Sequence, residues 1–282
     1  MNRRTFIGTS AAAIALPTFS QNTSKKLRVG VIGHTGRGNY GHGLDTVWLK
    51  VPETEIVAVA DAHAGGLEKA KKKLQIKKGF NDYRAMLKEM KPDIVAVCPR
   101  HIDQHHDMTL AAIEAGARGV YIEKPFVRTP AEVDSLTAAC EKHSTKIAIA
   151  HRNRWHPMLP VIDKFIADNH LGKLLEIRAR GKGDRRGGGE DLWVLGSHIM
   201  NLIHYFGGTP HTCSARIFQD GKPVTATDVK PGNEGLGPLA GNELHARYEM
   251  KRGMIAYFDS IANDGTQNHG FGLHLIGSKG II

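Results

Sequence analysis

The chain has 282 residues, of which 41% are hydrophobic, and carries a formal net charge of +10. This composition is ordinary for a globular protein with a sizeable core, and the length suits one large or two modest domains. The positive charges are interspersed with acidic residues, which argues against nucleic-acid binding. The cysteines are far apart and odd in number, so neither a disulfide framework nor a zinc motif is expected; they are Cys98, Cys140 and Cys213.

Residues 1–25 have the features of an export signal. Arg3 and Arg4 are followed by Phe6 and Ile7 and then by a mildly apolar, alanine-rich stretch over 9–16. This order is typical of a twin-arginine (Tat) signal, and the apolar stretch is too short to span a bilayer, which needs about 20 residues. We therefore expect a Tat signal and linker over 1–25. The mature protein would be periplasmic or otherwise exported, with no membrane attachment after cleavage.

A buried strand over 27–32 (LRVGVI) leads directly into a glycine-rich turn, and a helix carrying Leu44, Val47 and Trp48 inward is expected beyond it. Strand, glycine turn and helix form the context that a dinucleotide site requires. Glycine allows the backbone to approach a pyrophosphate, and a helix N-terminus offers free N–H groups. We prefer the register that begins at the strand's end over the literal G-x-G-x-x-G of 36–41. The candidate cofactor contacts here are Gly33, Thr35, Gly36, Arg37 and Gly38.

A second strand over 55–60 ends in Asp61. An acid in this place accepts hydrogen bonds from the adenosine ribose hydroxyls and repels a 2′-phosphate, so it favours NAD over NADP. Asp61 follows the turn at more than the usual spacing of about 20 residues, which fits a long first connection. The alternative role of N-cap for a helix from Ala64 onward is compatible with the same function.

The alternation of strands and helices continues to residue 150. Strands are expected over 93–97, 119–122 and 146–150, and helices over 67–74, 83–90, 109–115 and 131–143. This rhythm indicates a doubly wound parallel sheet, so residues 26–150 are predicted to be a dinucleotide-binding Rossmann domain.

Glu123-Lys124-Pro125 follows a strand directly, downstream of Cys98-Pro99, of His105 and of an Ala-x-x-Ala-Gly stretch over 112–116. Together these motifs resemble the glucose–fructose oxidoreductase and inositol dehydrogenase family, from residue 27 to the end, with Cys98 in place of the usual Thr. The resemblance implies that Lys124 lies beside the nicotinamide and the substrate hydroxyl, where a cation stabilises the forming alkoxide. It also implies cofactor contacts from Pro99, His105, Glu123, Lys124 and Asn153.

The family's second signature, Gly-x-His-x-x-Asp, is matched by Gly196, His198 and, in the Asp place, Asn201. The resemblance makes His198 the acid/base candidate, and imidazole suits proton removal near neutral pH. Two departures put the proton relay in question. Val194 stands where many polyol enzymes have an Asp, and Asn201 carries no charge; Asp191, one turn further back, is a poor substitute.

Residues 151–282 are predicted to form an α+β substrate domain with a mostly antiparallel sheet. Helices are expected over 161–167 and 191–207, the latter with Leu195, His198, Leu202 and Tyr205 on one face. Strands are expected over 174–179, 213–218, 243–249, 254–260 and 272–276. The glycine-rich loop 181–190, with Arg185 and Arg186, is either a lid or disordered. In the family the final residues turn into a further strand, so we expect this domain to be truncated.

These features predict an exported oxidoreductase that transfers hydride between NAD, less readily NADP, and a CH–OH group of a sugar or polyol. A homo-oligomer formed through the C-terminal sheet is compatible with this architecture. Two alternatives stay open: an NAD-dependent glycoside hydrolase that oxidises the sugar transiently, and a non-catalytic ligand-binding protein of the same fold. His101 and His105 would be i,i+4 neighbours on a helix, but no third ligand has motif spacing, so no metal is predicted.

Replacing Arg3 and Arg4 together by lysine tests the export signal. We expect the double variant to stay in the cytoplasm, because Tat signals depend on the arginine pair. Cell fractionation and immunoblotting against the unchanged chain provide the measurement. An equal exported fraction for the two proteins would contradict the Tat assignment.

Overall fold

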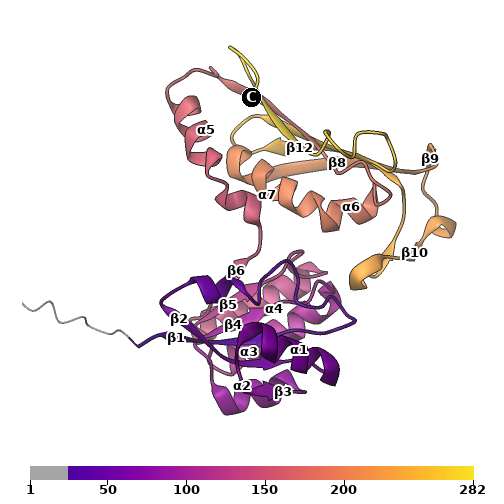
Figure 1. Cartoon of the computed structure of the whole chain (residues 1–282). Coiled ribbons are helices and arrows are strands. Elements are labelled where there is room, and N and C mark those ends of the chain that lie inside the picture. Colours follow the sequence, from indigo (N-terminus) through magenta and orange to yellow (C-terminus); the bar gives the residue numbers. More distant parts are fainter. Residues whose placement is uncertain (1–24) are drawn as a thin grey trace, which may run out of the picture.

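The computed structural model describes residues 25–282, so the expected Tat signal lies outside the described residues. Two layered units follow one another along the chain (Figure 1). The first contains a six-stranded parallel sheet in the order β3-β2-β1-β4-β5-β6, the strand order of a Rossmann fold. Its strands are β1 (Leu27–Ile32), β2 (Thr54–Ala60), β3 (Gly79–Phe80), β4 (Ile94–Val97), β5 (Gly119–Ile122) and β6 (Lys146–Ile149).

Helices cover both faces of this sheet, because alternate strand residues point to opposite sides. In β1, Val29 and Val31 pack into one core and Ile32 into the other. Asp82 and Thr129 cap the second and fourth helices with side-chain oxygens that accept from backbone N–H groups, as N-caps do. The helices are α1 (Ala64–Leu74), α2 (Tyr83–Met90), α3 (His105–Glu114) and α4 (Pro130–His143), with the short 3-10 turn η2 (Ile102–Gln104) before α3.

The second unit contains a sheet in the order β14-β7-β13-β12-β8-β9, antiparallel except for the β7–β13 pair. The predicted fold class is confirmed. Ile177, Phe258 and Leu275 pack beneath α5 and α7 on one face. The strands are β7 (Leu174–Arg180), β8 (Pro210–Gln219), β9 (Lys222–Pro223), β12 (Glu243–Met250), β13 (Ile255–Ile261) and β14 (Gly272–Gly277); the helices are η3 (Arg152–Trp155), α5 (Met158–Ala167), α6 (Gly189–Val194) and α7 (Gly196–Gly207).

The prediction of a helix directly after the glycine turn is wrong. Residues 41–46 form turns, followed by the 3-10 helix η1 (Val47–Lys50). Gly41 and Gly43 have φ values of 59° and 90°, whereas a right-handed helix needs about −63°. The N–H groups near a pyrophosphate would therefore come from the turn itself. Leu44 is buried as predicted, and Trp48 packs edge-on against Tyr121, whereas Val47, also expected to point inward, is exposed.

The single helix expected over 191–207 is also wrong, because the chain breaks at Leu195 between α6 and α7. Gly196 lies so close to Phe258 that a Cβ there would meet the ring at 2.9 Å, which fixes where α7 starts. Ile199, Ile203 and Phe206 of α7 face the core, and Leu202 and Tyr205 are partly buried against it. The loop over 181–190 is seated on the sheet, where the Gly188 N–H donates to Ser260 Oγ at 3.1 Å.

Residues 230–239 form a segment of the second unit that reaches back to the first (Figure 1). Its Glu234 lies 3.7 Å from Arg100, and its Leu236 packs with Ile102 and Val194. The segment contains β10 (Lys230–Pro231), η5 (Asn233–Gly235) and β11 (Pro238–Leu239), preceded by η4 (Ala226–Asp228). Among residues 25–282, no helix is long and apolar enough to cross a membrane.

Substitution of Gly36 and Gly38 in the cofactor turn distinguishes the cost of backbone strain from the cost of a close contact. Gly36 and Gly38 have φ values of 86° and 89°, but only Gly38 is crowded: a Cβ there would meet the backbone N of His101 at 2.6 Å. We expect Gly36→Ala to lower the free energy of unfolding by about 1–2 kcal/mol, the cost of a left-handed residue, and Gly38→Ala by clearly more. Urea denaturation measures both. Equal losses would show that the contact with 100–101 does not constrain the turn.

Candidate active site and cofactor groove

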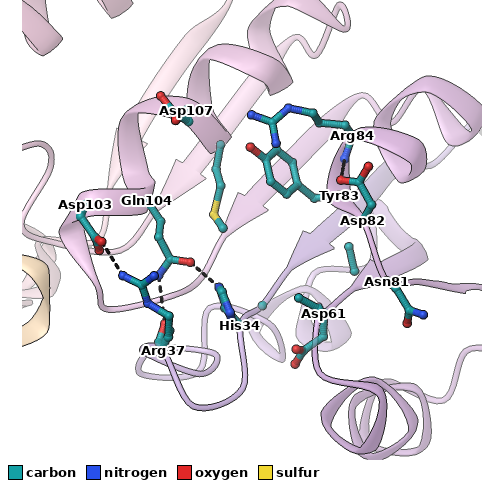
Figure 2. Close-up of a pocket in the computed structure, with 14 residues that line it drawn as sticks. His34, Arg37, Asp61, Asn81, Asp82, Tyr83, Arg84, Asp103, Gln104 and Asp107 are labelled. Atoms are coloured by element: carbon teal, nitrogen blue, oxygen red, sulfur yellow. Dashed lines mark hydrogen bonds and ion pairs between the residues drawn. The ribbon is translucent and has the colours of Figure 1, made fainter.

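A groove lies at the carboxyl ends of β1, β2 and β4, where the strand order reverses and ligands of open parallel sheets bind (Figure 2). Its volume of about 360 Å³ falls within the range of about 300–1,000 Å³ usual for ligand sites. Of the predicted cofactor residues, Gly33, Arg37 and Asp61 line it. Further lining residues are His34, Tyr83, Arg84, Asp103, Gln104 and Asp107.

Asp61 is 1% exposed, and protein groups already occupy both of its carboxylate oxygens. Oδ1 accepts from the N–H groups of Thr35 at 3.1 Å and His63 at 2.9 Å, and Oδ2 accepts from Thr35 Oγ1 at 2.6 Å and Tyr40 Oη at 2.8 Å. Burial would raise the pKa of Asp61, but these hydrogen bonds outweigh it and lower the pKa. Asp61 is thus a fixed negative charge in the groove, and a ribose hydroxyl would have to displace one of these donors.

Arg37 supplies a cation on the opposite wall of the groove. Its guanidinium pairs with Asp103, and Gln104 Nε2 donates to the Arg37 carbonyl at 3.1 Å (Figure 2). The side chain is half-exposed, so an anionic group could take the place of Asp103. At the end of the groove formed by α2, Arg84 stacks over the ring of Tyr83 at 4.5 Å. Sequence reasoning missed Tyr83 and Gln104, because only the fold brings them to the glycine turn.

A second cavity of about 200 Å³ lies between the two units, at the carboxyl ends of β5 and β6. It brings together Lys124 and His198, which come from different units, together with Glu123 and Asn153. The remaining lining residues are His42, Leu44, Tyr121, Ala150, Arg152, Leu195 and Phe271. This is the convergence that the resemblance implied.

Lys124 is 6% exposed, and its Nζ donates to the carbonyl of Val194 at 2.7 Å. Val194 is the last residue of α6, so its carbonyl has no partner within a continuous helix. At the position where the family resemblance leads us to expect an Asp, Val194 thus provides a backbone oxygen in place of a carboxylate. Burial lowers the pKa of Lys124, and the charge of Glu123 opposes that shift. The Lys124–Pro125 peptide bond is cis.

His198 is held in its neutral form. Burial, and then the charge of Lys124, lower its pKa to about 4. Its ring packs edge-to-face against His151, with the centroids 5.5 Å apart, and burial likewise lowers the pKa of His151 to about 4. Within the described part of the chain, the Nδ1 atoms of both rings are buried without a hydrogen-bond partner. His198 therefore carries no charge at neutral pH, and His151 is a neighbour that no motif indicated.

The structure does not place His105 or Pro99 in either cavity. His105 is fully buried; its Nε2 lies 2.7 Å from the Pro99 carbonyl, and its Nδ1 lies 2.8 Å from that of Pro125. It therefore joins the loops after β4 and β5 and fixes the turn that carries Lys124. Thr35 acts on Asp61, whereas Gly36 and Gly38 shape the turn. Across residues 25–282, no group of three or more His, Cys, Asp or Glu side chains is arranged to hold a metal ion.

The curated relatives include sugar and polyol dehydrogenases. D-glucoside 3-dehydrogenase of Escherichia coli K12 is 28% identical over 216 residues, covering 71% of this chain and 60% of that protein. The NADP(+)-dependent scyllo-inositol 2-dehydrogenase of Bacillus subtilis 168 is 22% identical over 220 residues, covering 72% and 58%. The chain thus spans less than two thirds of the length of these two relatives.

Solved structures with the same fold include levoglucosan dehydrogenase in complex with NADH and levoglucosan. Its TM-score is 0.70 at 19% identity, covering 91% of this chain and 72% of that one. Scyllo-inositol dehydrogenase of Lactobacillus casei with NAD(H) and scyllo-inositol gives 0.69 at 19% identity, covering 92% and 76%. The family model of oxidoreductases with an NAD-binding Rossmann fold matches residues 27–151. Residues 27–151 are therefore similar to the NAD-binding Rossmann domain of the Gfo/Idh/MocA oxidoreductase family.

Proposed function

We propose that the protein transfers hydride between NAD and a hydroxyl group of a sugar or polyol. The observation that carries this proposal is the convergence of Lys124 and His198, from two units, on one cavity. That cavity lies on the same edge of the parallel sheet as the groove that contains Arg37 and Asp61. The names of the relatives, which are glucoside, inositol and levoglucosan dehydrogenases, support the substrate class.

The roles of Lys124 and His198 follow from their protonation states. When bound, NAD supplies the acceptor for the hydride. Lys124 lies where its ammonium group can stabilise the negative charge that develops on the substrate oxygen. His198, neutral above about pH 4, takes the hydroxyl proton. The Val194 carbonyl holds Lys124 Nζ in place at 2.7 Å, so the cation is oriented before substrate arrives.

We also propose that the protein is exported. The support is the order of residues 3–16, in which an arginine pair precedes a mild apolar stretch. Tat carries folded proteins, so the cofactor would be acquired in the cytoplasm before export. Localisation outside the cytoplasm is then compatible with a nucleotide-dependent enzyme.

Asp61→Asn tests the cofactor preference. The unchanged protein should bind NAD at least about tenfold more tightly than NADP, because the ionised Asp61 repels a 2′-phosphate. The variant should lose most of this difference, since asparagine keeps the shape and removes the charge. Isothermal titration calorimetry gives both affinities, and circular dichroism confirms folding. Equal affinities in the unchanged protein would remove Asp61 from this role.

Lys124→Met tests the chemistry. Turnover with sugar substrates should fall about 10²–10³-fold, the usual loss for one oxyanion stabiliser, while NAD affinity stays within about twofold because the pyrophosphate contacts lie in the turn over residues 33–38. His198→Ala should lower turnover about 10²–10⁴-fold through loss of the base. Absorbance of NADH measures net oxidation and separates it from redox-neutral glycoside cleavage. Lys69→Met, at an exposed position of α1, is the control. Near-normal single-turnover hydride transfer by Lys124→Met would contradict the assignment.

A further inference from the structure

The second cavity contains more positive than negative charge. Lys124 and Arg152 line it together with His42 and His198, and Glu123 is the one carboxylate among its lining residues. The Glu123 side chain is 2% exposed and already engaged: Oε2 lies 3.3 Å from both the backbone N and Nδ1 of His42, and Oε1 accepts from the Lys124 N–H at 3.2 Å. Glu123 therefore has little capacity to balance a second cation.

Arg152 differs from its arginine neighbours. It lies at the start of η3, directly after β6, and takes part in none of the ion pairs or side-chain hydrogen bonds found within residues 25–282. Arg154, two residues on, stacks over the ring of Tyr205 at 4.2 Å and does not line the cavity. An arginine fork without a partner, at the wall of a cavity, is suited to binding a ligand.

All the titratable groups around His198 lower its pKa. After burial, its pKa is lowered in turn by Lys124 on the β5 turn, His151 after β6, Arg152 on η3 and His42 in the glycine turn. Around Lys124 itself, Glu123 and Glu234 raise the pKa, whereas Arg186 and Arg100 lower it. Arg152 is thus the cationic side chain beside the neutral His198, whereas the carboxylates Glu123 and Glu234 act on Lys124.

We propose that the substrate is a sugar acid whose carboxylate binds Arg152 and Asn153, while the hydroxyl to be oxidised lies at Lys124 and His198. This inference rests on the proposed function and narrows its substrate class. A guanidinium binds a carboxylate through two parallel hydrogen bonds, and the neighbouring amide offers a further donor. Arg152 is exposed to solvent and has no protein partner within residues 25–282, so a neutral polyol would form no ion pair with it.

The spacing of the two groups fits one small molecule. Lys124 follows β5 and Arg152 follows β6, and these strands pair in parallel register from Gly119 with Lys146 to Ile122 with Ile149. Neighbouring strands lie about 4.8 Å apart. The backbones that carry Lys124 and Arg152 therefore lie about one to two strand spacings apart, and both side chains line the same cavity.

The test compares sugars that differ at one carbon. Methyl glucuronide and methyl glucoside, and the matching galacto and manno pairs, are assayed for NADH formation. For the accepted configuration, kcat/KM should be about 10–100-fold higher for the uronide, the value of a hydrogen-bonded charge, and the difference should shrink with added salt. Equal or higher values for every neutral sugar would overturn the proposal.

Variants of Arg152 and Arg154 show which arginine produces the preference for the uronide. Arg152→Gln should lower kcat/KM for the uronide about 10–100-fold and that for the neutral glycoside far less, whereas Arg154→Gln should leave the ratio unchanged. An equal loss for both substrates in Arg152→Gln would contradict a carboxylate contact.

A binding measurement separates this inference from the proposed function. Calorimetric titration of the NADH complex with the uronide needs no turnover, and should show binding that Arg152→Gln weakens about 10–100-fold. Uronide binding without oxidation of any sugar would uphold the carboxylate site and overturn the dehydrogenase. Sugar oxidation without a preference for uronides would uphold the dehydrogenase and overturn the carboxylate site. Failure of every uronide to bind would overturn the carboxylate site.

Discussion

The site depends on keeping an ammonium group out of water. Lys124 is 6% exposed, and an isolated charge in such a place is costly unless polar groups surround it. The molecule meets this constraint with the Val194 carbonyl at 2.7 Å and with the nearby charge of Glu123. Because Val194 belongs to the second unit, the hydrogen bond that stabilises the lysine also joins the two halves of the cavity. The break at Leu195 therefore has a function: it ends α6 where a free carbonyl is needed.

The sequence predicts the features that depend on local pattern. The alternation of strands and helices in the first unit, the turn at Glu123-Lys124-Pro125 and the approach of His198 all follow from periodicity or motif. The break at Leu195 does not, since residues 191–207 are apolar enough for one helix and the constraint comes from Phe258, far along the chain. The turns after Gly41 likewise depend on backbone angles that composition leaves open.

Residue roles were harder to predict than residue positions. Asp61 has the expected place, yet its oxygens are engaged by Thr35, Tyr40 and His63, a set of contacts that depends on how the turn folds over β2. His105 has the place that the family pattern gives it, but its ring joins two loops and does not line the groove. His151 has no motif at all. Its contact with His198 arises because the end of β6 and α7 meet at the junction of the units.

Asp103 contacts both the groove and the segment 230–239. Its carboxylate pairs with Arg37 in the groove, and its side chain packs directly against Gly235 in the segment 230–239. A ligand phosphate that binds Arg37 would break its ion pair with Asp103, whose side chain contacts the segment at Gly235. Displacement of the segment would in turn alter the position of Asp103 and its ion pair with Arg37. Linkage requires such effects to be reciprocal, so the factor by which a nucleotide changes the seating of 230–239 equals the factor by which that seating changes the nucleotide's affinity. Through Asp103, the groove of the first unit is thereby in direct contact with the segment 230–239 of the second.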